Sequence, residues 1–332
     1  MQKITWGIIG CGDVTELKSG PAFNKVTNSA LVAVMRRNAD KAKDYAMRHK
    51  VPTWYDNASD LINDKNVNAI YIATPPSSHE EYTIAAAIAG KPVYVEKPMS
   101  VDAASAKRMS DAAKNANIKL SVAHYRRAQP YFNEIKKLIA NKVIGDIHFI
   151  QLHFYKKSLS KDELALPGNR WRVDAATSGG GLFHDLAPHQ LDILYYFFGD
   201  IQQANGLATN QSKQYASDDV VTGNILYKNG IVFSGVWRFN VAAGDEKDIC
   251  EIFGANGSIV FSFFGEQRIL VIKNGNSESI LFKPPQHVQQ PMIEKVVEYF
   301  LSEGPNPCSG DDGVISMELI DAFTKNNNYT RT

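Results

Sequence analysis

The sequence lacks the features that mark several specialised classes of protein. Its only cysteines, Cys11, Cys250 and Cys308, lie far apart and give neither a disulfide framework nor the spacing of a zinc site. The net charge of +1 provides no basic field for nucleic acid and no acidic tail. No run of about 18 apolar residues occurs, so we expect no membrane-spanning helix. The His, Asp and Glu residues show no metal-ligand spacing, and we expect no metal.

What is present is the composition of a globular protein. The chain has 332 residues, of which 44% are hydrophobic, and this length is enough for two domains with sizeable cores. The first apolar run begins at Ile4 and leaves no room for a signal peptide, which predicts a cytoplasmic location. No internal repeat or low-complexity tract is visible.

The first third of the chain alternates short apolar runs with helical stretches. Near-continuous apolar strands are buried on both faces, as in a parallel sheet. The pattern therefore predicts an α/β domain with a doubly wound parallel sheet, the Rossmann fold. The expected strands are Ile4–Ile9, Leu31–Met35, Ala69–Ala73, Pro92–Val95 and Ile118–Ala123, and the expected helices lie near Asp40–His49, Glu80–Ala89 and Asp102–Asn115.

After about residue 145 the pattern changes to alternating, aromatic-rich segments. Asn-Gly pairs at positions 229, 256 and 274 predict tight turns between them. We therefore expect a C-terminal α+β domain with a large open, mainly antiparallel sheet, one long helix from near Asp185, and closing helices near Gln290–Leu301 and Val314–Lys325. The expected strands are Ile147–Tyr155, Asp219–Tyr227, Ile231–Asn240, Asp248–Phe253, Ser258–Phe264 and Arg268–Lys273. The predicted domains are 1–123 and 124–332, with the return of a last helix from the C-terminus to the first domain left open.

A glycine turn follows the first predicted strand. Gly10 allows the tight turn, and Gly12 lets main-chain N–H groups approach a pyrophosphate without a Cβ in the way. The helix that follows directs its N-terminal dipole at the phosphates, so Asp13 and Val14 are further candidates for the cofactor site. The third position of the motif, usually Gly or Ala, is the larger Thr15.

The end of the second strand predicts which dinucleotide binds. An NAD enzyme usually has an acidic residue here, about 20 residues past the glycines, to bind the ribose 2′-hydroxyl. This chain has Arg36 and Arg37 instead, and guanidinium groups match a 2′-phosphate in charge and geometry. We therefore expect NADP rather than NAD. The alternative is that both arginines are solvated turn residues, and Asp40 is expected to cap the following helix.

Two longer motifs resemble one enzyme family. They are the segments Ala73–His79 (ATPPSSH) with Gly90–Pro98 (GKPVYVEKP), and Gly179–His189 (GGGLFHDLAPH). This combination resembles the glucose–fructose oxidoreductase / inositol dehydrogenase (Gfo/Idh/MocA) family over nearly the whole chain. The resemblance implies that Lys97, Asp185 and His189 line the substrate beside the nicotinamide. It further implies a cofactor role for Thr74, Pro75, His79 and Glu96, the last near the nicotinamide ribose, and an open sheet that serves as a dimer face.

The chemistry of these residues agrees with the resemblance. Oxidation of an alcohol needs a base at the hydroxyl oxygen while hydride leaves carbon, and a lysine next to a positive charge can serve as that base. Asp185 and His189 are four residues apart, so a helix beginning near Asp185 places both on one face, with Pro188 in the first turn. The alternatives are a lysine that extends to water, an aspartate that only caps the helix, and a histidine of the core.

Other candidates are less specific. Arg126 follows the fifth strand and either contacts substrate or lies on the surface. Trp171 and Arg172 suit a sugar or diol, although a hydrophobic anchor beside a surface arginine fits equally well. His79 either lines the cofactor cleft or caps the next helix.

Together these features predict an NAD(P)-dependent dehydrogenase or reductase acting on CH–OH groups. The expected reaction is hydride transfer between NADP and a sugar, polyol or cyclic diol, with no nucleic-acid or membrane partner. The alternatives are a cofactor-retaining sugar oxidoreductase or glycosidase, and a non-catalytic NADP sensor. We expect a homodimer or homotetramer built on the open sheet, with Tyr227, Phe233, Trp237 and Phe239 on the exposed face.

Overall fold

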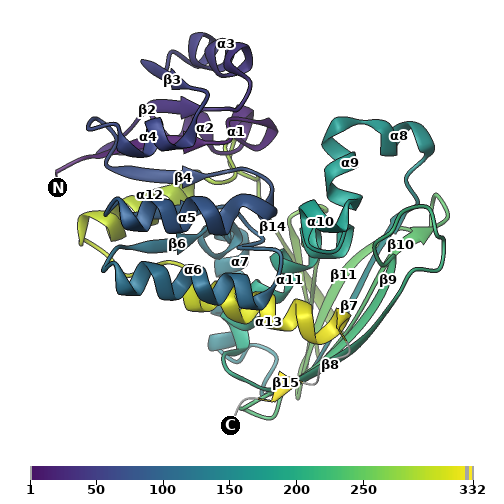
Figure 1. Cartoon of the computed structure of the whole chain (residues 1–332). Coiled ribbons are helices and arrows are strands. Elements are labelled where there is room, and N and C mark those ends of the chain that lie inside the picture. Colours follow the sequence, from purple (N-terminus) through teal and green to yellow (C-terminus); the bar gives the residue numbers. More distant parts are fainter. Residues whose placement is uncertain (1, 326–328, 331–332) are drawn as a thin grey trace. The chain divides into compact units, whose positions relative to one another are not determined.

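The computed structural model describes residues 2–325 and 329–330, and the chain forms two compact units. The first unit consists of Met1–Gln129 and Pro285–Ile315, and the second of Pro130–Pro284 and Ser316–Thr332. The chain therefore returns to the first unit after completing most of the second, a possibility that the predicted ranges 1–123 and 124–332 left open for the last helix. In Figure 1 the returning helix α12 (Gln290–Leu301) is yellow and lies among elements from the purple and blue first third of the chain.

The first unit is built on a six-stranded parallel sheet in the order β3-β2-β1-β4-β5-β6. The order reverses between β1 and β4, and such a switch point opens a crevice at the carboxyl ends of the strands. This confirms the predicted Rossmann fold. The strands are β1 (Ile4–Ile9), β2 (Ser29–Met35), β3 (Thr53–Tyr55), β4 (Ala69–Ile72), β5 (Val93–Val95) and β6 (Leu120–Val122). The helices are α1 (Asp13–Leu17), α2 (Gly20–Phe23), α3 (Ala39–His49), α4 (Ala58–Asn63), α5 (His79–Ile88), α6 (Ala103–Asn115) and α12, with 3₁₀ turns η1 (Pro76–Ser78) and η2 (Tyr125–Ala128).

Aromatic packing explains why the returning segment belongs to this unit. The Trp6 ring on β1 lies 4.9 Å from that of Phe23 and 5.5 Å from that of Phe300 on α12. Tyr71 on β4 joins the same cluster through Phe23 and Tyr94. Burying large rings is the main source of favourable free energy in such a core, so α12 is an integral part of the unit.

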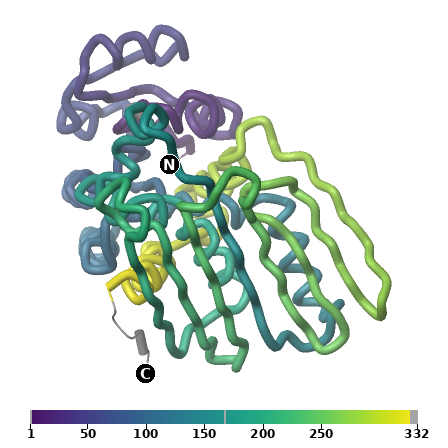
Figure 2. Tube along the Cα trace, turned by 90° about the vertical axis from the view of Figure 1, so that its right-hand side faces the viewer, coloured from purple at the N-terminus to yellow at the C-terminus, as the bar shows by residue number. Residues whose placement is uncertain are grey.

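The second unit contains a nine-stranded sheet in the order β14-β13-β12-β11-β7-β10-β9-β8-β15, and Figure 2 shows its green strands lying side by side. Most neighbours are antiparallel, but β7 and β10 pair in parallel, so the sheet is not the simple meander that the turns predict. The strands are β7 (Ile147–Lys157), β8 (Ile201–Thr209), β9 (Val220–Tyr227), β10 (Val232–Val241), β11 (Lys247–Gly254), β12 (Gly257–Phe261), β13 (Arg268–Lys273), β14 (Asn276–Leu281) and β15 (Tyr329–Thr330). The helices are α7 (Pro130–Ala140), α8 (Lys161–Ala165), α9 (Pro167–Val173), α10 (Ala175–Ser178), α11 (Leu182–Phe198) and α13 (Gly310–Thr324), of which the second part of α13 belongs here.

The aromatic residues expected on the exposed face of this sheet lie on the opposite face. Tyr227, Phe233, Trp237 and Phe239 are all fully buried. Trp237 donates its indole N–H to Gln190 Oε1 at 2.6 Å and packs against Phe183 of α11 and Phe323 of α13. The alternate residues of the strands therefore form the outer face, because side chains along a strand point to opposite sides in turn.

None of the helices within residues 2–325 is long and apolar enough to cross a membrane.

Candidate active site

The glycine turn sits at the carboxyl end of β1, against the end of β4. Gly10 has φ +95°, and a Cβ there would lie 2.8 Å from the Thr74 nitrogen, so only glycine fits this crossing. Gly12 is the N-cap of α1, and a Cβ on it would meet nothing nearer than 4.0 Å, which leaves its outer side open to a ligand. Thr15 is fully buried and donates its hydroxyl to Gly12 O at 2.7 Å. The larger third residue therefore stabilises the turn through a hydrogen bond.

A cavity of about 350 Å³ opens at this turn and brings together most of the predicted cofactor residues. Its lining includes Gly10 and Gly12 of the turn after β1, Arg36 and Arg37 after β2, and Thr74 and Pro75 after β4. Lys41, which the motif analysis did not single out, also lines it and places a third cation there. Asp13, Val14, His79, Glu96 and Lys97 are not part of its lining.

The turn after β2 is ordered by its own hydrogen bonds. Asn38, and not Asp40 as expected, is the N-cap of α3 and accepts from the Lys41 main-chain nitrogen at 2.9 Å. Arg36 donates from Nη1 to Cys11 O at 3.3 Å, so its guanidinium lies over the glycine turn. The arginine is therefore held at the cavity, which argues against a freely solvated turn residue.

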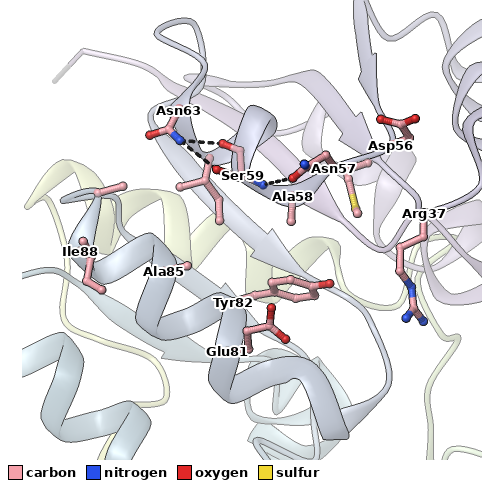
Figure 3. A pocket seen from close by; sticks show the side chains of 13 residues that line it. Arg37, Asp56, Asn57, Ala58, Ser59, Asn63, Glu81, Tyr82, Ala85 and Ile88 are labelled. Atoms are coloured by element: carbon pink, nitrogen blue, oxygen red, sulfur yellow. Dashed lines mark hydrogen bonds between the residues drawn. The ribbon is translucent and has the colours of Figure 1, made fainter.

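A second cavity of about 660 Å³ shares Met35, Arg37 and Tyr82 with the first. Figure 3 shows Tyr82 and Ala85 of α5 on one side and Ala58 and Ser59 of α4 on the other. Its lining is mixed, with apolar side chains such as Met35 and Ile62 beside polar ones such as Asp56, Asn57 and Glu81. Sequence reasoning missed this space because α4, and α5 beyond His79, carry no recognisable motif.

His79 connects the loop after β4 with the loop after β5. Its ring is fully buried, with Nε2 2.7 Å from Thr74 O and Nδ1 3.1 Å from Pro98 O. Burial lowers the pKa of this imidazole, so the neutral ring is favoured. A neutral imidazole has a single N–H and donates to one of these carbonyls at a time, so His79 packs between the two loops with its ring buried. Lys97, which follows Glu96 directly after β5, is half-buried in the second of the two loops.

Asp185 and His189 both lie on α11, four residues apart. The helix begins at Leu182, three residues earlier than expected, with Gly181 as the N-cap. Asp185 is therefore not the capping residue, and Pro188 lies inside the helix and not in its first turn. Asp185 forms an ion pair with Arg172 Nε at 3.0 Å, so this arginine orients the carboxylate.

An aromatic ring that sequence reasoning missed lies beside His189. The ring of Phe264, 38% exposed, meets the imidazole edge to face at a centroid distance of 5.5 Å. Asp248 fixes the loop that carries it, because its carboxylate accepts main-chain N–H groups from Phe263 and Gly265 at 3.0 Å each. No motif marks Phe264, since its position depends on the pairing of β11 with β12.

The remaining candidates divide into buried and half-buried residues. Arg126 is buried and donates from Nη1 to Tyr125 Oη at 2.6 Å, which excludes the expected surface alternative. The Trp171 ring lies 4.9 Å from the Arg172 guanidinium, so the two side chains stack.

The glycines before α11 are required by packing. A Cβ on Gly181 would lie 2.0 Å from Ser217 Oγ, and one on Gly180 would lie 2.1 Å from the His184 ring. The missing Cβ atoms allow the start of α11 to pack against Ser217 and His184.

We expect Gly181→Ala to destabilise the protein more than Gly230→Ala. Both glycines have φ +86°, but Gly181 also has ψ −155°, which is strongly unfavourable for any other residue, and its Cβ would meet Ser217, whereas the space around Gly230 is empty. Strain alone costs about 1–2 kcal/mol, and overpacking adds about 1–3 kcal/mol. Urea unfolding of the two variants measures the difference. Equal free energies of unfolding would show that the Ser217 contact relaxes without cost.

Comparisons with known proteins agree with the architecture. Residues 4–124 match the family model described as "Oxidoreductase family, NAD-binding Rossmann fold", and residues 132–260 match "GFO/IDH/MocA C-terminal domain". "Oxidoreductase P35" of Formosa agariphila is 46% identical over 97% of this chain and 98% of its own length. The "1,5-anhydro-D-fructose reductase" of Ensifer adhaerens is 25% identical over 94% of this chain and 92% of its own.

Among solved structures, a levoglucosan dehydrogenase in complex with NADH and levoglucosan superposes with a TM-score of 0.83 at 23% identity, covering 99% of both chains. At that identity the likeness shows the fold. The Rossmann sheet and its glycine turn define a dinucleotide-binding oxidoreductase. The chain belongs to the Gfo/Idh/MocA family.

Proposed function

We propose that this enzyme transfers a hydride between NADP and a CH–OH carbon of a sugar, polyol or cyclic diol. NADP is favoured because three cations, Arg36, Arg37 and Lys41, line the same cavity as Gly10 and Gly12. A 2′-phosphate adds about two negative charges, and arginine binds phosphate in a bidentate geometry. The substrate class is supported by the names of relatives, which include the anhydrofructose reductase and a "Myo-inositol 2-dehydrogenase" of Thermotoga maritima.

The residues fit the cofactor that the family implies. The crossing at Gly10 has no room for a Cβ, the outer side of Gly12 is open, and three cations line the same cavity, which supports a phosphate ligand. When bound, the nicotinamide supplies a reversible hydride acceptor. Oxidation then removes a hydride from the substrate carbon and a proton from its hydroxyl. We assign that proton to Lys97 Nζ, which returns it to the oxygen in the reverse reaction.

His189 and Asp185 are proposed to act on the same hydroxyl groups. A histidine titrates near neutral pH and can share a proton with the lysine. Asp185, oriented by Arg172, is an acceptor for a second substrate hydroxyl.

Two other functions make different predictions. A cofactor-retaining enzyme would keep its nucleotide through purification and cycle it between two substrates. A sensor would bind NADP without turnover, and such a protein would not need Lys97, Asp185 and His189 together.

A substrate screen tests the proposal. Purified enzyme is mixed with NADP⁺ or NAD⁺ and a panel of cyclic polyols, aldoses and aromatic diols, and the nicotinamide absorbance is followed. We expect NADP⁺ reduction with at least one ring-shaped alcohol. Tight nucleotide binding without turnover across the panel would favour the sensor.

We further propose that the outer face of the sheet in the second unit joins copies of this chain. Val236, His153 and Ile249 lie side by side across β10, β7 and β11. Phe149 and Phe253 pair four residues further along β7 and β11, with ring centroids 6.0 Å apart. A continuous half-apolar face of this kind is typical of an association surface.

We expect Ile249→Glu to convert the oligomer into monomers, because it places a charge at the centre of this face, where the residue is 44% exposed. Leu281→Glu is the matched control, since Leu281 is 66% exposed but lies on the edge strand β14. Light scattering at micromolar concentration measures the mass. A monomeric parent protein, or a variant that remains a dimer or tetramer, would contradict the assignment.

A further inference from the structure

Glu96, directly before Lys97, turns its carboxylate into the interior of the first unit. Its Oε1 accepts from the Tyr71 hydroxyl at 2.5 Å and from Gln289 Nε2 at 2.6 Å. Its Oε2 accepts from the main-chain nitrogen of Lys97 at 3.1 Å. The carboxylate therefore connects the main chain at Lys97 to two side chains of the core.

One of those side chains comes from the segment that returns from the second unit. The segment His287–Gln289 precedes α12 and crosses the end of α1. His287 Nδ1 lies 2.7 Å from Leu17 O, and the main-chain nitrogen of Gln289 donates to Lys18 O at 3.3 Å. Because Lys25 Nζ lies 2.7 Å from His287 Nε2, that nitrogen is the acceptor and Nδ1 is the donor to Leu17. The same segment thus binds the helix of the glycine turn and the residue before Lys97.

The geometry fixes the orientation of the Gln289 amide. The side chain is buried, and its Oε1 has no hydrogen-bond partner among the described residues. Turning the amide around would place this oxygen against the Glu96 carboxylate, which repels it. The buried amide group is therefore held in place as a donor to Glu96.

The opposite side of the carboxylate is equally well supported. The Tyr71 hydroxyl lies 3.2 Å from Ser19 Oγ, in the turn between α1 and α2, and its ring stacks on Tyr94 at 5.2 Å. Burial and the neighbouring Glu96 raise the pKa of Tyr71 well above its usual range, so it stays a hydrogen-bond donor. Ser19 therefore contacts Glu96 indirectly, through Tyr71, and Gln289 contacts it directly. The segments that carry Ser19 and Gln289 both bind the end of α1, the helix of the glycine turn.

We propose that Gln289 is a positioning residue for Lys97, acting through Glu96 from the segment that returns to the first unit. The proposal rests on the proposed role of Lys97 as the proton carrier. Gln289 fixes the carboxylate, the carboxylate fixes the main-chain N–H of Lys97, and the catalytic amine extends from a constrained backbone. The segment His287–Gln289 thereby holds both the glycine turn and the loop of Lys97. The distance between the proposed pyrophosphate site and the proposed proton carrier is then fixed within this unit.

The test compares Gln289→Met with Gln290→Met. Methionine keeps the length of the side chain and removes the donor. Gln290 is the matched control, because its amide donates to the exposed Glu294 one turn along α12, at 3.1 Å. Tyr71→Phe removes the other donor to the same oxygen and serves as a second variant should Gln289→Met fail to fold.

The first readout is hydrogen exchange of the Lys97 main-chain amide, measured by mass spectrometry on a short peptide that contains it. Pro98 has no N–H, so it adds no exchanging hydrogen next to Lys97. We expect exchange about 10-fold faster in Gln289→Met and Tyr71→Phe and unchanged in Gln290→Met. The second readout is kcat on the substrate found in the screen, which should fall about 10-fold while the Kd of NADP stays within about twofold.

Unchanged exchange at Lys97 in both donor variants would overturn the proposal, as would faster exchange with an unaltered kcat. A loss of NADP affinity as large as the loss of kcat would also overturn it, since it would indicate general damage to the unit. Failure of the proposed function shows differently, as a parent enzyme without turnover, and leaves the exchange measurement valid.

Discussion

Lys97→Met should reduce kcat by about 10²–10⁴, the usual contribution of a general acid or base, while NADP binding changes little. The phosphate and ribose groups are assigned to the cavity at Gly10, Gly12 and the three cations, and Lys97 does not line that cavity. The methionine keeps most of the side-chain volume, so the loss reports the amine and not a packing defect. Steady-state kinetics with nucleotide titration by fluorescence separates the two quantities.

Lys91→Met is the matched control, because Lys91 lies just before β5 and Lys97 just after it. Its Nζ donates to Asp64 O at 2.7 Å, so its loss should lower stability and not kcat. His189→Ala should reduce turnover by less than Lys97→Met if the histidine only assists. The two losses should be less than additive, because both groups would act on one proton. Near-parental kcat in Lys97→Met would exclude the lysine as the proton carrier and favour His189 or a sensor role.

The double variant Arg36→Ala, Arg37→Ala should lose the preference for NADP over NAD. Each charged hydrogen bond to the 2′-phosphate contributes about 1.5–3 kcal/mol, so the pair accounts for a change in relative affinity of about 10²-fold or more. NAD lacks that phosphate, and its affinity should fall far less. Fluorescence titration of both nucleotides against parent and variant measures the ratio.

Lys43→Ala provides the control for this pair, since Lys43 is an exposed cation on α3 outside the cavity. Its loss removes one positive charge from the helix that follows the two arginines, outside the lining of the cavity. Equal affinity of the parent protein for the two nucleotides, or tighter binding of NAD, would contradict the NADP assignment. Added salt should weaken NADP binding more than NAD binding, because a screened ion pair contributes less.

The parallel sheet was predictable because its strands are nearly continuous apolar runs. Ile4–Ile9 was predicted with the bounds that β1 has, and the expected Ala69–Ala73 differs from β4 by one residue. In a strand with both faces buried nearly every residue is apolar, so the strand is recognised from the apolar run alone. The edge strand β3 and the peripheral β8 and β14 were missed, because half-exposed strands with polar residues resemble loops.

The exposed face of the second sheet could not be predicted in the same way. The alternation in β10 shows that Phe233 and Trp237 share one face, but it does not show which face is covered. That is decided by Phe183 of α11 and Phe323 of α13, which are distant in sequence. Aromatic content alone suggested an association surface, whereas the rings form the core.

At the candidate site, short motifs predicted several residues that line one cavity, and they did not predict contacts that depend on tertiary structure. The glycine turn and the residues after β2 and β4 share one cavity, as expected from parallel strands that end at one edge. Gln289 has no motif and reaches Glu96 only because the chain returns after the second unit. Pro188 was placed in the first turn because the Leu182 start of α11 depends on packing around Gly180 and Gly181.

Transfer of deuterium from substrate to nucleotide tests the central claim most directly. The enzyme is incubated with NADP⁺ and the alcohol found in the screen, deuterated at the reacting carbon, and the nucleotide is analysed by mass spectrometry. The account predicts reduced NADP that carries one deuterium, formed by the parent protein and greatly slowed in Lys97→Met. Bound nucleotide that remains oxidised and unlabelled with every alcohol of the panel would contradict it.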